Sequence, residues 1–178
     1  MKFSWRRFAG SVAAASVLVT GPTALPASAH PADTAHPLIT CLGNAAVRFT
    51  PGLALLPRDS RISGDARYLC AGTDPALTSA TSVIKGGGKT SCLSLDTTAV
   101  EFVTWNTGEH SKVLYKTRHL AQPLIGEVLS LVEGKVIEGK FKDHPVGSPG
   151  AQITLDPLSC ATEKGVQEID GPTTLVFT

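Results

Sequence analysis

The sequence predicts an all-β fold, an antiparallel β-sandwich of about seven to nine strands with two disulfides. Short runs such as Ala45–Phe49 alternate between two sets of side chains, which is the period of a strand with one buried face. Turn residues separate these runs at spacings of about 8–12 residues, a pattern typical of sandwiches and barrels. Beyond the N-terminus, no stretch of about 11 or more residues has a helical period.

Glycine, proline and asparagine separate the expected strands. These strands are Leu38–Phe49, Arg61–Cys70, Val100–Trp105, Ser111–Thr117, Leu124–Val132, Val136–Phe141, Ala151–Leu155 and Thr173–Thr178. Asn106-Thr107-Gly108 predicts a hairpin turn. The glycine triplet Gly86-Gly87-Gly88 is expected in a loop before Cys92. Gly134 is expected to separate two strands.

The alternation in the strand Val100–Trp105 does not by itself show which of its two faces is buried. Glu101, Val103 and Trp105 share one face, so either this face or the opposite one belongs to the core. A single tryptophan on an alternating strand more often belongs to a core or a hairpin than to a ligand platform. We therefore interpret Trp105 as a core residue.

Residues 1–29 have the order of a secretory signal peptide. Lys2, Arg6 and Arg7 precede an apolar run, and Ala27-Ser28-Ala29 forms a small-x-small cleavage pattern. The apolar run is shorter than the about 20 residues that a membrane helix needs. We therefore expect a secreted (extracellular) protein without a membrane anchor.

Cleavage after Ala29 leaves a flexible N-terminal segment, residues 30–37, and a single domain, residues 38–178. The leader contains three of the 16 basic residues and no acidic residue, so 13 basic and 15 acidic residues remain. This balance argues against a nucleic-acid partner, which requires a strongly basic face. We expect the mature protein to be a monomer.

All four cysteines, Cys41, Cys70, Cys92 and Cys160, lie after the leader and predict two disulfides in an exported chain. A hairpin that pairs Phe49 with Ile62 also places Cys41 opposite Cys70, which favours Cys41–Cys70 with Cys92–Cys160. The connectivity Cys41–Cys160 with Cys70–Cys92 stays open. No C-x-x-C occurs, so neither a zinc site nor a redox pair is indicated.

Two short motifs imitate catalytic signatures. Gly88-Lys89-Thr90 resembles the end of a phosphate-binding loop, but Val83 stands where the first glycine of that loop is required. Ser82-Val83-Ile84-Lys85 fits the S-x-x-K of penicillin-interacting enzymes, but it runs directly into three glycines. No serine is marked as the nucleophile of a triad. We therefore predict no catalytic residue and no cofactor.

A copper site at His30 is the one metal hypothesis. If His30 is the mature N-terminus, its imidazole and the free α-amine can bind one copper ion, as in the histidine brace of copper oxidoreductases. His110, His119 or His144 would supply the further ligand. The alternative interpretation is that these three histidines are solvated surface residues without a ligand role.

Several short segments occur in an order that resembles small secreted actinobacterial proteins of uncharacterised function. The segments are Cys41-Leu42-Gly43, Pro51-Gly52-Leu53, Pro57-Arg58, Tyr68-Leu69-Cys70, Ser91-Cys92, Trp105-Asn106-Thr107-Gly108, Gly134–Phe141 and Cys160. The resemblance implies an immunoglobulin-like β-sandwich and brings no catalytic residue or ligand. Glu109-His110 departs from the group, in which small hydroxyl residues are expected after the turn.

The leading hypothesis is a non-enzymatic extracellular binding or structural module that contacts an extracellular protein or a cell-wall component. One alternative is the copper oxidoreductase based on His30. Another is a secreted protease inhibitor with an exposed loop at Pro51–Arg58 or Gly86–Cys92, where Lys89-Thr90-Ser91 is the candidate reactive segment.

Overall fold

The computed structural model describes residues 38–121, 128–129, 132–148, 152–153 and 157–178. The expected leader and the segment 30–37 lie outside these residues. The elements are β1 (Ile39–Leu53), β2 (Arg58–Gly72), β3 (Ser79–Thr90), β4 (Ser94–Trp105), β5 (His110–Ala121), β6 (Val128–Leu129), β7 (Val132–Gly139), β8 (Pro145–Ser148), β9 (Gln152–Ile153), α1 (Pro157–Cys160) and β10 (Val166–Phe177).

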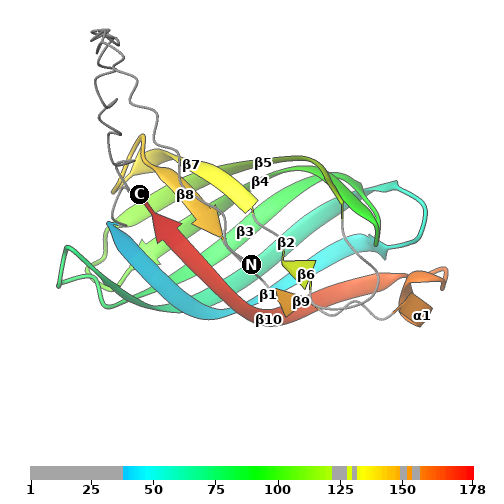
Figure 1. The fold of residues 1–178 in the computed structure, drawn as a ribbon, viewed down its shortest axis with the longest axis horizontal. Helices are drawn as coiled ribbons and strands as arrows, with labels where there is room; N and C mark the ends of the chain where they lie inside the picture. Colours follow the sequence, from blue (N-terminus) through cyan, green and yellow to red (C-terminus); the bar gives the residue numbers. More distant parts are fainter. Residues whose placement is uncertain (1–37, 122–127, 130–131, 149–151, 154–156) are drawn as a thin grey trace, which may run out of the picture. The chain divides into compact units, whose positions relative to one another are not determined.

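Eight of these strands form one closed antiparallel barrel in the order β1-β10-β8-β7-β5-β4-β3-β2 (Figure 1). β6 and β9 pair with each other in a separate two-stranded sheet. The prediction of an all-β, antiparallel fold is confirmed, and the eight barrel strands fall within the expected range.

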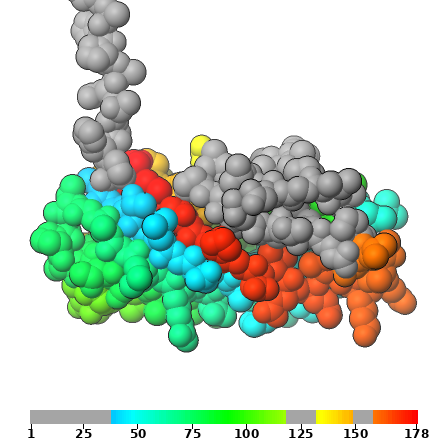
Figure 2. Space-filling model, turned by 60° about the horizontal axis from the view of Figure 1, so that its bottom comes forward, coloured from blue at the N-terminus to red at the C-terminus, as the bar shows by residue number. Residues whose placement is uncertain are grey.

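The arrangement of the strands differs from the expected immunoglobulin-like sandwich, because one sheet closes on itself. β1 pairs with β2 along one edge and with β10 along the other, over Ile39–Arg48 and Glu168–Phe177. Figures 1 and 2 show β1 and β10 side by side. Alternating side chains fit both architectures, since each buries one face of every strand. The closing ladder joins the two ends of the domain, and local sequence patterns carry no signal for such a pairing.

The β1–β2 hairpin has the predicted register. Phe49 lies opposite Ile62, and Cys41 lies opposite Cys70. The favoured disulfides, Cys41–Cys70 and Cys92–Cys160, are both present. The second disulfide joins the turn after β3 to α1.

The glycine triplet lies inside β3 and not in a loop, so that prediction is wrong. Gly86 pairs with Ile62 of β2 on one side and with Ala99 of β4 on the other. A Cβ atom on Gly86 would lie 2.5 Å from the carbonyl oxygen of Thr98 and 2.7 Å from Cβ of Ala99. Glycine is therefore needed here because two strands approach closely. In the sequence, such glycines look the same as glycines that mark a loop.

Gly134 also lies within a strand, β7, where it was expected to separate two strands. The hairpin turn at Asn106-Thr107-Gly108 is confirmed: the Gly108 N–H donates to the Trp105 carbonyl at 2.9 Å, and Gly108 has φ of 86°. A positive φ is the conformation that favours glycine at such a turn.

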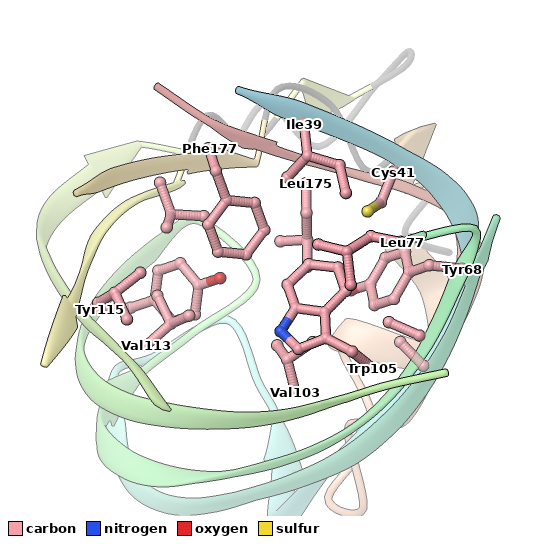
Figure 3. Packing of buried hydrophobic residues seen from close by; sticks show 14 residues of the cluster. Ile39, Cys41, Tyr68, Leu77, Val103, Trp105, Val113, Tyr115, Leu175 and Phe177 are labelled. Atoms are coloured by element: carbon pink, nitrogen blue, oxygen red, sulfur yellow. The ribbon is translucent and has the colours of Figure 1, made fainter. Parts of the chain in front are cut away.

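Two buried apolar clusters fill the two ends of the barrel. The larger one surrounds Trp105, which is 2% exposed (Figure 3). The indole N–H donates to the Ser111 hydroxyl at 2.9 Å, and the ring packs against Phe141 and Phe177. The interpretation of Trp105 as a core residue is confirmed. The smaller cluster consists of Phe49, Leu53, Ile62, Cys92 and Cys160.

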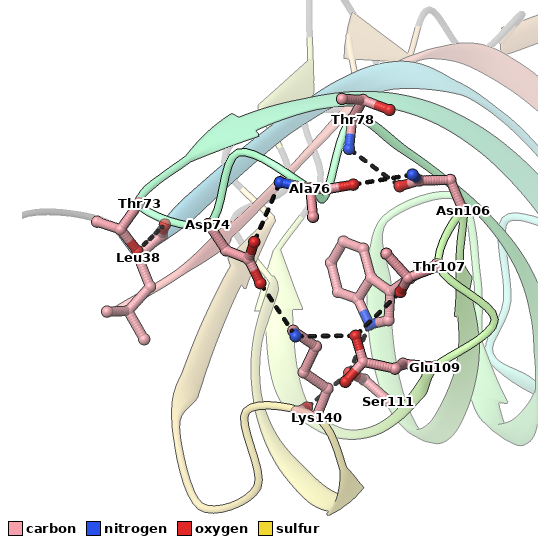
Figure 4. A network of polar contacts seen from close by, with 11 residues as sticks. Leu38, Thr73, Asp74, Ala76, Thr78, Asn106, Thr107, Glu109, Ser111 and Lys140 are labelled. Carbon is pink, nitrogen blue, oxygen red and sulfur yellow. Dashed lines mark hydrogen bonds and ion pairs between the residues drawn. The ribbon is translucent and has the colours of Figure 1, made fainter.

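Polar contacts tie together the loops at the Trp105 end (Figure 4). The Lys140 ammonium lies 3.1 Å from the Asp74 carboxylate and 2.9 Å from the Glu109 carboxylate. Hydrogen bonds to Lys140 lower the pKa of both carboxyls and raise the pKa of the ammonium. Lys140 thus joins the loops of Asp74 and Glu109 at the surface, and Glu109, which departs from the resembling group, is one of its two partners.

A pair of glycine substitutions tests the packing of β3. Gly86→Ala is expected to lower the free energy of unfolding by about 1–3 kcal/mol, because the new methyl group overlaps Thr98 and Ala99. Gly87→Ala, where the nearest atom is 3.0 Å away, is expected to cost less. Urea unfolding followed by circular dichroism measures both. Equal effects of the two substitutions would contradict this packing.

Candidate functional site

A cavity of about 190 Å³ lies inside the barrel. Residues from all eight barrel strands line it. Small side chains at Ala45, Ala99 and Gly171 leave this space open. Ala45 and Gly171 face each other across the β1–β10 ladder, so barrel closure itself builds this part of the wall. The other apolar lining residues are Val47, Phe49, Ile62, Ile84, Leu95, Val132, Ile169 and Leu175.

Glu101 is the one carboxylate among the described residues that line the cavity, and it is 3% exposed. Three hydroxyl groups donate hydrogen bonds to it. Tyr68 and Ser82 donate to Oε1 at 3.0 and 2.5 Å, and Tyr115 donates to Oε2 at 2.8 Å. The donors come from β2, β3 and β5, while the acceptor belongs to β4. The network therefore joins four strands through the interior.

Glycines on neighbouring strands make room for both tyrosine rings. Gly43 lies opposite Tyr68, and Gly134 lies opposite Tyr115. A Cβ atom would lie 2.9 Å from the Tyr68 ring at Gly43 and 2.6 Å from the Tyr115 ring at Gly134. The two rings thus lie over bare backbone, which directs their hydroxyl groups to Glu101.

Burial raises the pKa of the Tyr68 phenol far above its ordinary value, and the adjacent Glu101 carboxylate raises it further. The Tyr115 phenol has a raised pKa for the same two reasons, in the same order. Both phenols therefore stay protonated at neutral pH and act as hydrogen-bond donors. Neither is suited to act as a base or as a nucleophilic phenolate.

Further hydroxyl groups line other parts of the cavity wall. They belong to Thr97, Thr117, Ser148 and Thr173. No Lys, Arg or His occurs among the described residues of this wall. The site thus combines one buried acid and several hydroxyls with a mainly apolar surface, which is the usual composition of a small-molecule site.

The sequence singled out Ser82 for a role that the structure does not support. Ser82 is buried and points to Glu101, whereas Lys85, the last residue of the same S-x-x-K tetrad, is exposed on the same strand. A strand places residues three apart on opposite faces, so this lysine cannot activate the serine. Lys89 of the phosphate-loop imitation is likewise an exposed strand residue.

The described part of the structure does not bring the proposed copper ligands together. His30 lies outside this part, and so does the side chain of His119. His110 and His144 are exposed, and His144 Nδ1 lies 3.0 Å from the Thr178 carbonyl oxygen. Among the side chains that the structure describes, no three His, Cys, Asp or Glu residues form a group able to hold a metal ion.

Sequence reasoning missed Glu101, Tyr68 and Tyr115 as a group. The available signal was the shared face of Glu101 with Val103 and Trp105, since an acid in register with two core residues is a buried acid. Its partners come from other strands, and only the barrel closure and register identify them.

The fold and the site define a closed antiparallel β-barrel with a polar group inside an apolar cavity. Comparison of the chain with known protein families, with curated proteins and with solved structures found no match. In the described part of the chain, no helix is long and apolar enough to cross a membrane.

Raised phenol pKa values make stability depend on alkaline pH. The unfolded chain releases its phenol protons near pH 10, whereas the folded chain retains them. The free energy of unfolding should therefore be insensitive to these groups below about pH 9 and fall as the pH rises above about 10. The chain has only two tyrosines, so phenolate absorbance reports on this site alone. Phenolate should appear together with unfolding, and its appearance in the folded protein would contradict the burial.

Proposed function

We propose that this chain is a secreted binding protein that holds a small, mainly apolar molecule inside its barrel. The observation that carries this proposal is the cavity of about 190 Å³ with Glu101 in its otherwise apolar wall. An engineered cavity of about 150 Å³ in another protein binds benzene. The volume here suits a molecule of one ring with a short substituent.

Binding is favoured over catalysis by the roles of the polar groups. Tyr68, Tyr115 and Ser82 all direct their hydroxyl protons to Glu101. The serine has a carboxylate partner but no histidine or lysine, and the phenols stay neutral. Such a set fixes the orientation of a ligand by hydrogen bonds, whereas it contains no activated nucleophile.

Secretion is part of the proposal, supported by the leader pattern of residues 1–29 and by two disulfides. Disulfides persist in oxidising compartments. A surface partner, either an extracellular protein or a wall component, stays a prediction beside the cavity ligand. The copper site also stays a prediction, and N-terminal sequencing of the secreted protein tests whether His30 comes first.

Filling the cavity tests the proposal. Ala45 lines the cavity, whereas its neighbour Asn44 is exposed on the outer face of β1. We expect 4-fluorotoluene to bind the wild-type protein and Asn44→Leu, and Ala45→Leu to weaken binding at least about tenfold by occupying the space. Fluorine NMR titration measures the dissociation constants. Equal binding to the wild type and to Ala45→Leu would exclude the cavity as the site.

Protease inhibition is a second candidate, favoured by the loop 54–57 between β1 and β2. Leu56 is 80% exposed there. Both sides of the loop are held: Arg58 Nε donates to the Gly52 carbonyl at 2.8 Å, and the Cys92 N–H donates to the Ala54 carbonyl at 2.8 Å. The other proposed loop, Gly86–Cys92, is mostly strand with a buried end, so it offers no exposed reactive segment.

A charged side chain at the loop tip tests the second candidate. If Leu56 enters the specificity pocket of a chymotrypsin-like protease, Leu56→Asp should abolish inhibition, because an unpaired carboxylate is not tolerated in an apolar pocket. Leu69→Asp is the matched control, since Leu69 is 76% exposed on β2, away from the loop. Steady-state inhibition assays measure both. Rapid cleavage of the wild-type loop, or no inhibition at all, would rule this candidate out.

A further inference from the structure

We infer that the ligand of the barrel is a small apolar molecule with a protonated amino group, and that this group donates a hydrogen bond to the Glu101 carboxylate. This inference rests on the proposed function, because it assigns the chemistry of the molecule that the same cavity holds. It follows from the hydrogen-bond capacity of Glu101, from the absence of a cation in the described wall, and from the size of the cavity.

Glu101 has one acceptor position to spare. A carboxylate offers about four lone-pair positions on its two oxygens. Tyr68 and Ser82 occupy two on Oε1, while Tyr115 occupies one on Oε2. The remaining position on Oε2 can accept a hydrogen bond from a donor inside the cavity, whose wall includes Glu101.

The three hydrogen bonds compensate the buried carboxylate only in part. A carboxylate away from water is costly unless it is paired with a cation and hydrogen-bonded. Among the described residues, no Lys, Arg or His lines the cavity, and no ion pair involves Glu101. A cationic ligand would supply the missing partner, whereas an anionic ligand would face repulsion from Glu101.

An ammonium group fits the remaining acceptors. It has three N–H donors and no acceptor. Glu101 Oε2 can take one donor, and the phenol oxygen of Tyr115, 2.8 Å from Oε2, can take another. The hydroxyl group of Thr173, which contacts the Tyr68 phenol, is a further acceptor in the same wall. A guanidinium group, with five donors in a fixed plane, needs more acceptors and more space. The site therefore favours a primary amine on one ring or a short chain.

The test compares three probes of nearly the same shape: 4-fluorobenzylamine, 4-fluorobenzyl alcohol and 4-fluorotoluene. Fluorine NMR titrations at neutral pH, where the amine is protonated, give their dissociation constants. The amine should bind wild-type protein at least about tenfold more tightly than the alcohol, since only the ammonium group adds an attraction between opposite charges to its hydrogen bond with the Glu101 carboxylate. Glu101→Gln should remove this difference. The matched control Glu138→Gln, on the exposed side of β7, should keep it.

The outcomes separate the inference from the proposed function. If the alcohol or the toluene binds the wild type as tightly as the amine, the cavity is a binding site and the inference of an amine is overturned. If none of the three probes binds, the proposed function fails as well. Should Glu101→Gln not fold, carbon NMR of the wild-type Glu101 carboxyl decides. Its signal should shift with the amine and not with the alcohol, and equal shifts would overturn the inference.

Discussion

The ladder between β1 and β10 closes the barrel, and the cavity depends on that closure. Without it, Ala45 and Gly171 would lie on separate sheet edges and the inward face around Glu101 would be open to water. Closure also removes the exposed edges that an open antiparallel sheet carries. The space inside an eight-stranded barrel is just large enough for side chains. A central layer of small residues is therefore sufficient to leave room for a ligand.

The two ends of the barrel are closed by different means. At one end, the apolar cluster around Trp105 lies below the loops that Lys140 connects. At the other end, the Cys92–Cys160 disulfide holds α1 against the smaller cluster with Phe49. The cavity borders both clusters, through Tyr68 and Tyr115 of the larger one and Phe49 and Ile62 of the smaller one. A buried acid such as Glu101 in its wall costs stability, which is expected at a functional site more often than in a structural core.

The sequence predicts local pairing well and distant pairing poorly. The register that places Cys41 opposite Cys70 follows from a hairpin between neighbouring strands, and the structure confirms it. β10 begins at Val166, whereas the expected strand started at Thr173. Pro172 pairs with Asn44 inside the closing ladder. The residues missing from the expected strand, 166–172, thus belong to the ladder that closes the barrel.

The candidate site was unpredictable for a related reason. Alternation placed Glu101 on one face with Trp105, so its burial followed once Trp105 was taken as a core residue, but its hydrogen-bond partners did not follow. The phenols that donate to Glu101 lie 33 and 14 residues away along the chain. Spacing in the sequence carries no signal for such a cluster, because it forms through the register of the barrel.

A crystal structure of the protein with 4-fluorobenzylamine tests the central claim most directly. The account predicts a single closed barrel in which the amine nitrogen lies within hydrogen-bond distance of Glu101 Oε2, with the ring between the two apolar clusters. Two separate sheets, a Glu101 side chain in solvent, or an amine bound only on the outer surface would contradict it.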